Sequence, residues 1–258
     1  MSVPINVCLE DTPWDMYNIQ GRTAWVKRED LCCPGGPPFS KMRGLQAHLQ
    51  KQDANIIGAL DTIHSKAGWA VAYVCNLLEK QCINFYPGNE PKLSQIKAQK
   101  HGALIWPLRP GRSAILWHRA HKMLKQIHPF AYMMPNGLQL EESVEETKKI
   151  VSVSPRHVLG GTWLVSASTG TIAKGISEGL EGRAELIVHM GYSRSIEMMR
   201  KKVGLYTTVV DEGYAYRDSV DYPCPFPCNP WYDLKAWKWL NENINLLHDP
   251  IVFWNIGE

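Results

Sequence analysis

Short apolar segments alternate with helix-like segments along almost the whole chain, and this alternation restricts the possible folds more than any other feature. The expected strands are residues 23–26, 56–60, 82–86, 103–106, 163–166, 185–189 and 251–254. The expected helices are residues 41–51, 67–78, 91–101, 114–127, 141–151, 172–180, 193–202 and 232–245. Such alternation is typical of mostly parallel sheets with helices on both faces. The sequence therefore predicts an α/β fold with three layers.

Ligands of parallel sheets usually bind beyond the carboxyl ends of the strands, where loops lead into helices. Three loops of this kind, residues 35–40, 61–66 and 167–171, each follow a strand and open a helix. Side chains with a chemical role are therefore expected first in these loops.

The first loop ends in a lysine at the start of a helix, in the segment KREDLCCPGGPPFSKMRG (27–44). Ser40 is expected to cap this helix. The positive end of the helix dipole disfavours the charged form of Lys41, which lowers its pKa. A neutral amine is the form that reacts with an aldehyde cofactor. Taken alone, the segment is equally typical of a solvated lysine on an amphipathic helix.

The segment VSASTGTIAKG (165–175) places small and hydroxylated residues between a strand and a helix. Ser168, Thr169, Gly170 and Thr171 would present hydroxyl and backbone N–H groups to a phosphate at the helix start. An ordinary helix cap would have the same composition. The order GxxxxGK[ST] and the fingerprint GxGxxG are both absent, which argues against a nucleotide P-loop and a dinucleotide site.

The segment DTIHSKAGWAVA (61–72) places Ser65 where a loop becomes a helix. Its hydroxyl could hold a carboxylate, or it could simply cap the helix.

In this order, the three motifs resemble fold-type II enzymes that depend on pyridoxal 5′-phosphate (PLP), the tryptophan synthase β-like group. The match is to the branch of aminocyclopropane-carboxylate deaminase and D-cysteine desulfhydrase, and it extends through VVDEGYAY (209–216), YDLKAWKW (232–239) and IVFWNIG (251–257). The resemblance implies that Lys41 is the Schiff-base lysine, that Ser65 positions the substrate carboxylate, and that residues 168–171 bind the cofactor phosphate. It implies that Tyr214 or Tyr216 acts as an acid or base, although both could be ordinary loop residues.

The sequence departs from this family at two places. Lys66 stands where the family usually has an asparagine near the phenolic oxygen of the cofactor, so it is a rival or additional acid–base group. Ile256 replaces the threonine that meets the pyridine nitrogen, and we expect Asn255 and Glu258 to contribute to cofactor binding there.

The resemblance implies two subdomains, a large PLP-binding domain (1–52 and 135–258) and a smaller inserted α/β domain (53–134). It also implies a homodimer and a lyase reaction on an amino-acid-like substrate. Compact members of the group occur in bacterial viruses that hypermodify thymine, where the reaction would be decarboxylation of an amino-acid-modified thymine such as α-glycyl-thymine. A deaminase or desulfhydrase acting on a small free amino acid, and a non-catalytic PLP-binding protein, remain as alternatives.

Charge is distributed unevenly along the chain. Residues 91–140 contain eight lysine and arginine residues and no Asp or Glu, whereas the rest of the chain has 20 basic and 25 acidic residues. The basic stretch predicts contact with a polyanion such as duplex DNA. The candidate contacts are Lys97, Lys100, Arg109, Arg112, Arg119, Lys122 and Lys125. A solvated helix face balanced by acidic neighbours would show the same pattern.

Seven cysteines without a secretory signal favour reduced thiols. CPFPC (224–228) supplies only two metal ligands, so no metal site is expected. The N-terminus does not resemble a signal peptide, and no stretch reaches the roughly 20 apolar residues of a membrane helix. We therefore expect a cytoplasmic protein, in the host cytoplasm if it is viral, without a membrane partner.

Overall fold

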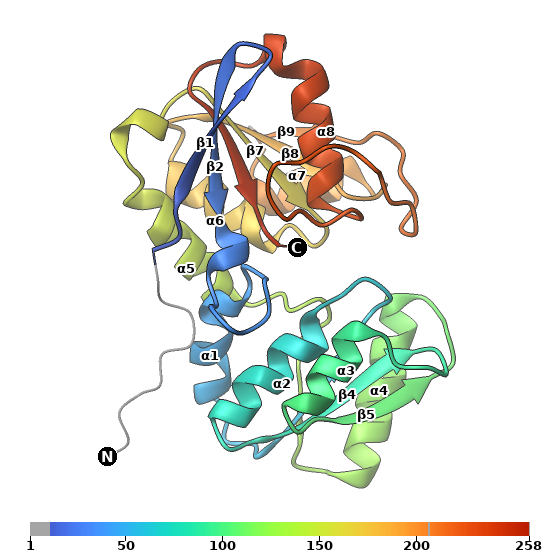
Figure 1. The fold of residues 1–258 in the computed structure, drawn as a ribbon. Helices are drawn as coiled ribbons and strands as arrows, with labels where there is room; N and C mark the ends of the chain where they lie inside the picture. Colours follow the sequence, from blue (N-terminus) through green and yellow to red (C-terminus); the bar gives the residue numbers. More distant parts are fainter. Residues whose placement is uncertain (1–10, 206, 258) are drawn as a thin grey trace. The chain divides into compact units, whose positions relative to one another are not determined.

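The computed structural model describes residues 11–205 and 207–257. Within these ranges the chain forms two compact α/β units, which are described separately (Figure 1). The larger unit comprises residues 11–33, 38–43, 143–205 and 207–257, and the smaller unit comprises residues 34–37 and 44–142. Residues 44–52 and 135–142, which were expected in the larger domain, group with the smaller unit.

The larger unit is built on a six-stranded sheet in the order β1-β2-β10-β7-β8-β9. The strands are β1 (Trp14–Ile19), β2 (Arg22–Arg28), β7 (Thr162–Ala167), β8 (Glu185–Met190), β9 (Thr208–Val210) and β10 (Ile251–Asn255). All neighbours are parallel except β1, which pairs antiparallel with β2. Every residue of β7 and β10 is buried, as expected for parallel strands covered on both faces. The parallel strands therefore bring their carboxyl ends to one edge of the sheet.

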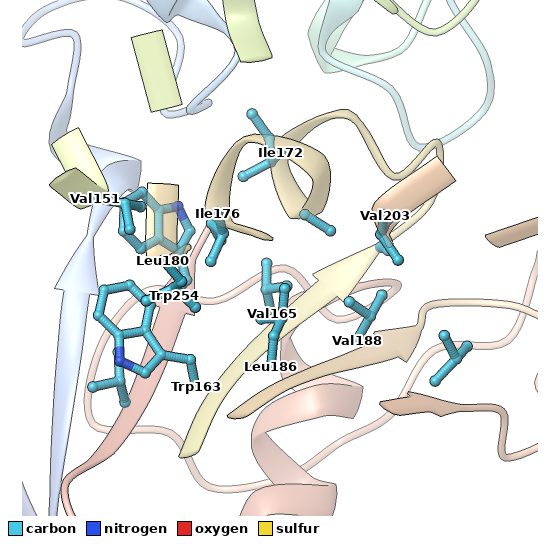
Figure 2. Packing of buried hydrophobic residues seen from close by; sticks show 14 of the residues in the cluster. Val151, Trp163, Val165, Ile172, Ile176, Leu180, Leu186, Val188, Val203 and Trp254 are labelled. Atoms are coloured by element: carbon cyan, nitrogen blue, oxygen red, sulfur yellow. The ribbon is translucent and has the colours of Figure 1, made fainter. Parts of the chain in front are cut away.

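Helices cover both faces of this sheet. Apolar side chains of α5 (Glu141–Ser152), α6 (Thr171–Leu180) and α7 (Ile196–Val203) pack on one face, and those of α8 (Asp233–Asn243) pack on the other. Figure 2 shows the first interface, where Val165 of β7 faces Ile176 of α6 and Val188 of β8 faces Val203 of α7. Each fully buried aliphatic side chain contributes about 1.5–3 kcal/mol, so this core holds the start of α6 firmly in place.

The smaller unit has a four-stranded parallel sheet in the order β5-β4-β3-β6. Its elements are β3 (Ile56–Leu60), β4 (Gln81–Pro87), β5 (Leu104–Leu108), β6 (Tyr132–Met133), α2 (Ala67–Leu77), α3 (Leu93–Lys100) and α4 (Ser113–Ile127). Side chains alternate along β4, so Ile83 and Phe85 pack with α4 while Asn84 faces Gly68 of α2. Helices therefore cover both faces here as well.

The remaining elements connect these layers. Helix α1 (Met42–Gln50) starts in the larger unit and continues in the smaller one. Three short 3-10 helices are η1 (Glu29–Leu31), η2 (Arg156–Val158) and η3 (Ile244–Leu246). The α/β class, the parallel sheets and the flanking helices expected from the sequence are confirmed. In the described part of the chain, no helix has the length and apolarity needed to span a membrane.

Candidate active site

Lys41 lies in the larger unit, in the segment that follows β2 and precedes α1. This segment is attached to the end of β10 by the N–H of Ser40, which donates to the carbonyl of Ile256 at 2.8 Å, and by a β-bridge between Phe39 and Gly257. The Lys41 side chain is 8% exposed, and its Nζ donates to Thr169 Oγ1 at 2.9 Å. The structure therefore brings together the two motifs that the sequence placed 128 residues apart.

The environment of Lys41 favours a neutral amine. Burial, together with the positive charges of Lys202 and Arg194, lowers the pKa of Lys41 to about 7, from the ordinary value of 10.5. The sequence predicted the direction of this shift from the dipole of the following helix, but the causes found here are burial and neighbouring cations. Near neutral pH, a large fraction of Lys41 is therefore able to act as a nucleophile.

Residues 168–171 form a cradle between β7 and α6. Gly170 has φ of 76°, and a Cβ built on it would lie 2.9 Å from Met199 Sδ, so a larger residue would disturb the turn. The hydroxyls of Thr169 and Thr171 lie 3.2 Å apart. The first N–H groups of any α-helix lack acceptors within the helix, so α6 directs donors toward this loop. The cradle has the composition and geometry of a phosphate site.

Buried polar atoms without partners lie on the segments attached to the Lys41 loop. Asn255, at the end of β10, is fully buried, and its Nδ2 donates to the carbonyl of Pro227 at 3.0 Å. Within residues 11–205 and 207–257, its Oδ1 has no hydrogen-bond partner, and neither has the buried Ser40 Oγ. The expected capping of α1 by the Ser40 hydroxyl is therefore wrong. Unsatisfied buried polar atoms are costly, which is consistent with a polar ligand beside Lys41. Glu258 lies outside the described residues.

Two predicted tyrosines lie on the loop after β9, but in different surroundings. The ring of Tyr214 lies 4.6 Å from Lys235 Nζ, and burial, followed by the charge of Glu212, raises the pKa of Tyr214. Tyr216 instead forms an edge-to-face pair with Tyr192, with ring centroids 5.0 Å apart. Tyr214 is thus placed to keep its proton, whereas Tyr216 belongs to an aromatic cluster.

The loop that contains Ser65 and Lys66 belongs to the smaller unit. Ser65 Oγ accepts from the N–H of Ala67 at 3.0 Å, but Lys66 occupies the N-cap position of α2 and no side-chain capping bond is formed there. Lys66 directly precedes α2.

Asp61, at the start of the same loop, was not singled out in the sequence. Its buried carboxylate accepts hydrogen bonds from the N–H of Gly68 (2.6 Å), Gln95 Nε2 (2.7 Å), Asn84 Nδ2 (3.0 Å) and Ser94 Oγ (3.2 Å). These bonds fix the loop in front of α2.

The cations of the basic stretch also lie in the smaller unit. Lys97 and Lys100 are on α3, Arg109 and Arg112 precede α4, and Arg119, Lys122 and Lys125 are on α4. One surface groove, with a volume of about 510 Å³, is lined by Ala114, Ile115, His118, Arg119 and Lys122 of α4. Among the residues that the structure describes, no three His, Cys, Asp or Glu side chains form a candidate metal site.

No family model matches the sequence. The chain is 45% identical to the glycyl-dTMP PLP-dependent decarboxylase of Pseudomonas phage M6, over an alignment of 276 residues that covers 97% of this chain and 99% of that protein. The chain belongs to the family of this phage decarboxylase. The family lies within the fold-type II group that the motifs indicated, so the resemblance drawn from the sequence is confirmed.

Solved structures similar to this family member share its fold. An ACC deaminase homologue has a TM-score of 0.79 at 17% identity, covering 97% of this chain and 91% of that chain. A hydrogen sulfide-producing enzyme from Fusobacterium nucleatum has a TM-score of 0.68 at 14% identity, covering 96% and 95%. The O-acetylserine dependent cystathionine beta-synthase from Helicobacter pylori also has a TM-score of 0.68, at 13% identity, covering 100% and 97%.

The sequence analysis of this phage-decarboxylase family member did not identify Arg194 and Lys202, two cations near Lys41. Arg194 Nη1 donates to the carbonyl of Ser168 at 3.1 Å, and the charge of Lys202 contributes to lowering the pKa of Lys41. The segment GYSRS (191–195) follows a buried parallel strand and opens a helix, the same criterion that selected the other loops. Applied to β8, that criterion would have found Arg194.

Proposed function

We propose that this chain is a PLP-dependent decarboxylase that removes the α-carboxyl group from a glycyl unit carried on a thymine nucleotide. The relative at 45% identity is named for decarboxylation of glycyl-dTMP. The observation that carries the proposal is the buried amine of Lys41, with a pKa of about 7, in hydrogen-bond contact with the cradle at 168–171. An amine of this kind beside a phosphate site is what an aldehyde cofactor with a phosphate group requires.

The residues present fit PLP. Lys41 would bind its aldehyde covalently, and the cradle at Ser168–Thr171 would bind its phosphate. Asn255 Oδ1, which has no partner among the described residues, would supply a polar contact from β10. When bound, PLP withdraws electrons from the α-carbon, so that a bond to that carbon can break.

The side chains of the protein then determine which bond to the α-carbon breaks and supply the proton that replaces the carboxylate. The family resemblance implies that the Ser65 hydroxyl would hold the substrate carboxylate. Breaking the bond between Cα and the carboxylate releases CO2 and leaves an electron pair on Cα, which takes up one proton. Lys41 supplies that proton, because a group with a pKa of about 7 both holds and releases protons near neutral pH. Lys66, Tyr214 and Tyr216 are the further acid–base candidates.

We propose in addition that the nucleotide is part of duplex DNA in the host cytoplasm, and that Lys97, Lys100, Arg109, Arg112, Arg119, Lys122 and Lys125 contact its backbone. The absence of Asp and Glu from residues 91–140 supports this proposal. A homodimer is proposed from the family resemblance.

The test is to incubate the purified holoenzyme with glycyl-dTMP, with DNA that contains it, and with small free amino acids. We expect CO2 and an aminoalkyl pyrimidine from the thymine substrates, and neither from Lys41→Ala. Ammonia or sulfide from free amino acids, without CO2, would assign the chain to the deaminase or desulfhydrase class instead. A visible absorption band that borohydride traps on Lys41, without turnover of any substrate, would identify a PLP-binding protein that is not an enzyme.

A further inference from the structure

The loop after β8 carries an arginine, Arg194, to which the proposed chemistry assigns no contact with the substrate. The guanidinium of Arg194 lies 4.4 Å from the centroid of the Tyr192 ring, and its Nη1 donates to the carbonyl of Ser168 at 3.1 Å. Among residues 11–205 and 207–257, no carboxylate forms a salt bridge with it. Its side chain is exposed, so it presents a positive charge to solvent at the edge of the phosphate cradle.

Hydrogen bonds fix the conformation of this loop on both sides of Arg194. Ser193 donates through its backbone N–H to the carbonyl of Tyr214 at 2.8 Å and through its hydroxyl to Asp211 at 2.7 Å. Ser195 caps α7 by accepting from the N–H of Met198 at 3.2 Å. Arg194 is therefore held between two anchored serines, which lowers the entropic cost of binding a ligand there.

Three tyrosine rings surround the same loop. Tyr192 packs edge-to-face with Tyr216, and a hydrogen bond links Tyr216 to Tyr232. The ring of Tyr232 lies against Gly191, where an added Cβ would come within 2.7 Å of its Cδ1. Aromatic rings beside an arginine form a common binding surface for a nucleotide, because bases stack on rings while the guanidinium pairs with phosphate oxygens.

We propose that Tyr192 and Arg194 form a subsite for the nucleotide part of the substrate, with the guanidinium on its phosphate and the tyrosine rings against its base. This inference rests on the proposed function, which supplies a substrate that carries both a phosphate and an aromatic base. A small free amino acid has neither group and would leave the subsite unused.

The phosphate of PLP is a second possible ligand of Arg194. The cradle already offers the hydroxyls of Thr169 and Thr171 together with the start of α6, and it needs no group from the solvent-exposed side. The guanidinium instead lies over the Tyr192 ring, 4.4 Å from its centroid. We therefore assign Arg194 to the phosphate of the substrate, and the test separates the two sources.

The experiment measures binding of dTMP and of thymidine to the PLP-loaded protein by calorimetry, in the wild type, Arg194→Gln and Tyr192→Leu. The control is Arg200→Gln, the same change at an exposed arginine of α7. We expect the wild type and the control to bind dTMP at least roughly tenfold more tightly than thymidine. Arg194→Gln should abolish most of that preference, and Tyr192→Leu should weaken binding of both ligands about 5–50-fold.

Three results would overturn the subsite: no dTMP binding by the wild type, an unchanged preference for dTMP in Arg194→Gln, or a loss of PLP affinity as the main effect of that change. PLP affinity is measured separately by titrating the apoprotein. Release of CO2 from glycyl-dTMP by the wild type tests the proposed function independently. Arg194-dependent dTMP binding without CO2 release would keep the subsite and refute the decarboxylase.

Discussion

At the scale of single residues, the reactivity of Lys41 depends on what surrounds its amino group. The amine is buried and donates to the hydroxyl of Thr169, and the charges that lower its pKa, on Lys202 and Arg194, are both positive. A sequence can suggest a lysine at a helix start, but burial and cations brought from α7 and the loop before it depend on the folded chain. The direction of the pKa shift of Lys41 was therefore predictable, whereas its main cause, burial, was not.

The rate at which Lys41 captures added PLP should rise with pH and reach half of its maximum near pH 7, because only the neutral amine attacks the aldehyde. The rate is followed by visible absorbance after PLP is mixed with apoprotein. In Lys202→Gln the midpoint should shift upward by roughly half a pH unit, since one like charge is removed. A wild-type midpoint close to 10.5, the ordinary lysine value, would contradict this account.

Lys41 should also reduce the stability of the apoprotein. Its pKa is lower in the folded state, so the unfolded chain binds more protons between about pH 7 and 10.5, and the stability of the wild type rises across that range. Below pH 7 the full penalty is present. Replacing Lys41 by Met should therefore increase the free energy of unfolding at pH 7 by about 1–3 kcal/mol, even though the bond to Thr169 is lost. Urea denaturation at pH 7 and pH 10 measures the gain, which should shrink at the higher pH.

At the scale of elements, most strands and the amphipathic helices were predictable, including the largely exposed β5, whereas β1 and the shortest strands were not. β7 and β10 are continuous apolar runs because both of their faces are covered. β1 was not predicted, because most of its side chains are partly or fully exposed and it therefore contains no continuous apolar run. Its turn has positive φ at Gln20 (52°) and Gly21 (84°), and Gln-Gly is a weaker hairpin signal than Asn-Gly. β9, with only three residues, carries too little pattern to be recognised.

The turn between β7 and α6 provides a test of the phosphate cradle. Gly170→Ala combines a strained φ of 76° with a Cβ 2.9 Å from Met199 Sδ. We expect a loss of about 2–4 kcal/mol in the free energy of unfolding and weaker binding of PLP, because the backbone donors of the cradle move. Urea denaturation and titration with PLP measure the two effects.

Gly213→Ala is the matched control, since Gly213 has φ of 81° but no atom within 4 Å of an added Cβ. It should lose only about 1 kcal/mol, the cost of the backbone strain, and keep the wild-type affinity for PLP. Equal effects of the two changes would mean that the contact with Met199 and the position of the cradle are unimportant.

At the scale of the whole molecule, the proposed cofactor site and the acid-free stretch lie in different units. The residues expected to hold PLP lie in the larger unit, whereas the acid-free stretch 91–140 lies in the smaller one. The sequence predicted a basic smaller domain because charge can be counted along a chain without knowing the fold, and the role of that charge stays a prediction. The proposed subsite at Arg194 could not be predicted from the sequence in this way, because it combines the loops after β8 and β9 with the cradle after β7.

Binding of duplex DNA should depend on salt in proportion to the number of phosphate contacts made by the smaller unit. Each contact contributes about −0.9 to the slope of log K against log salt concentration. Replacing Arg112, Arg119 and Lys122 together by Gln should therefore reduce the magnitude of the slope by roughly 2–3 and weaken binding at low salt. Fluorescence anisotropy of a labelled duplex at several salt concentrations measures both quantities.

The control replaces three exposed cations of the larger unit, Lys149, Arg200 and Lys201, by Gln, so that the net charge changes by the same amount. If the basic stretch contacts DNA, the control keeps nearly the wild-type slope, because only contacting cations displace counterions from the duplex. If the magnitude of the slope falls by the same amount in both triple variants, the protein attracts DNA through its net charge alone. The stretch at 91–140 would then be an ordinary solvated surface, and the nucleotide substrate would have to be recognised by the larger unit without help from the backbone of the duplex.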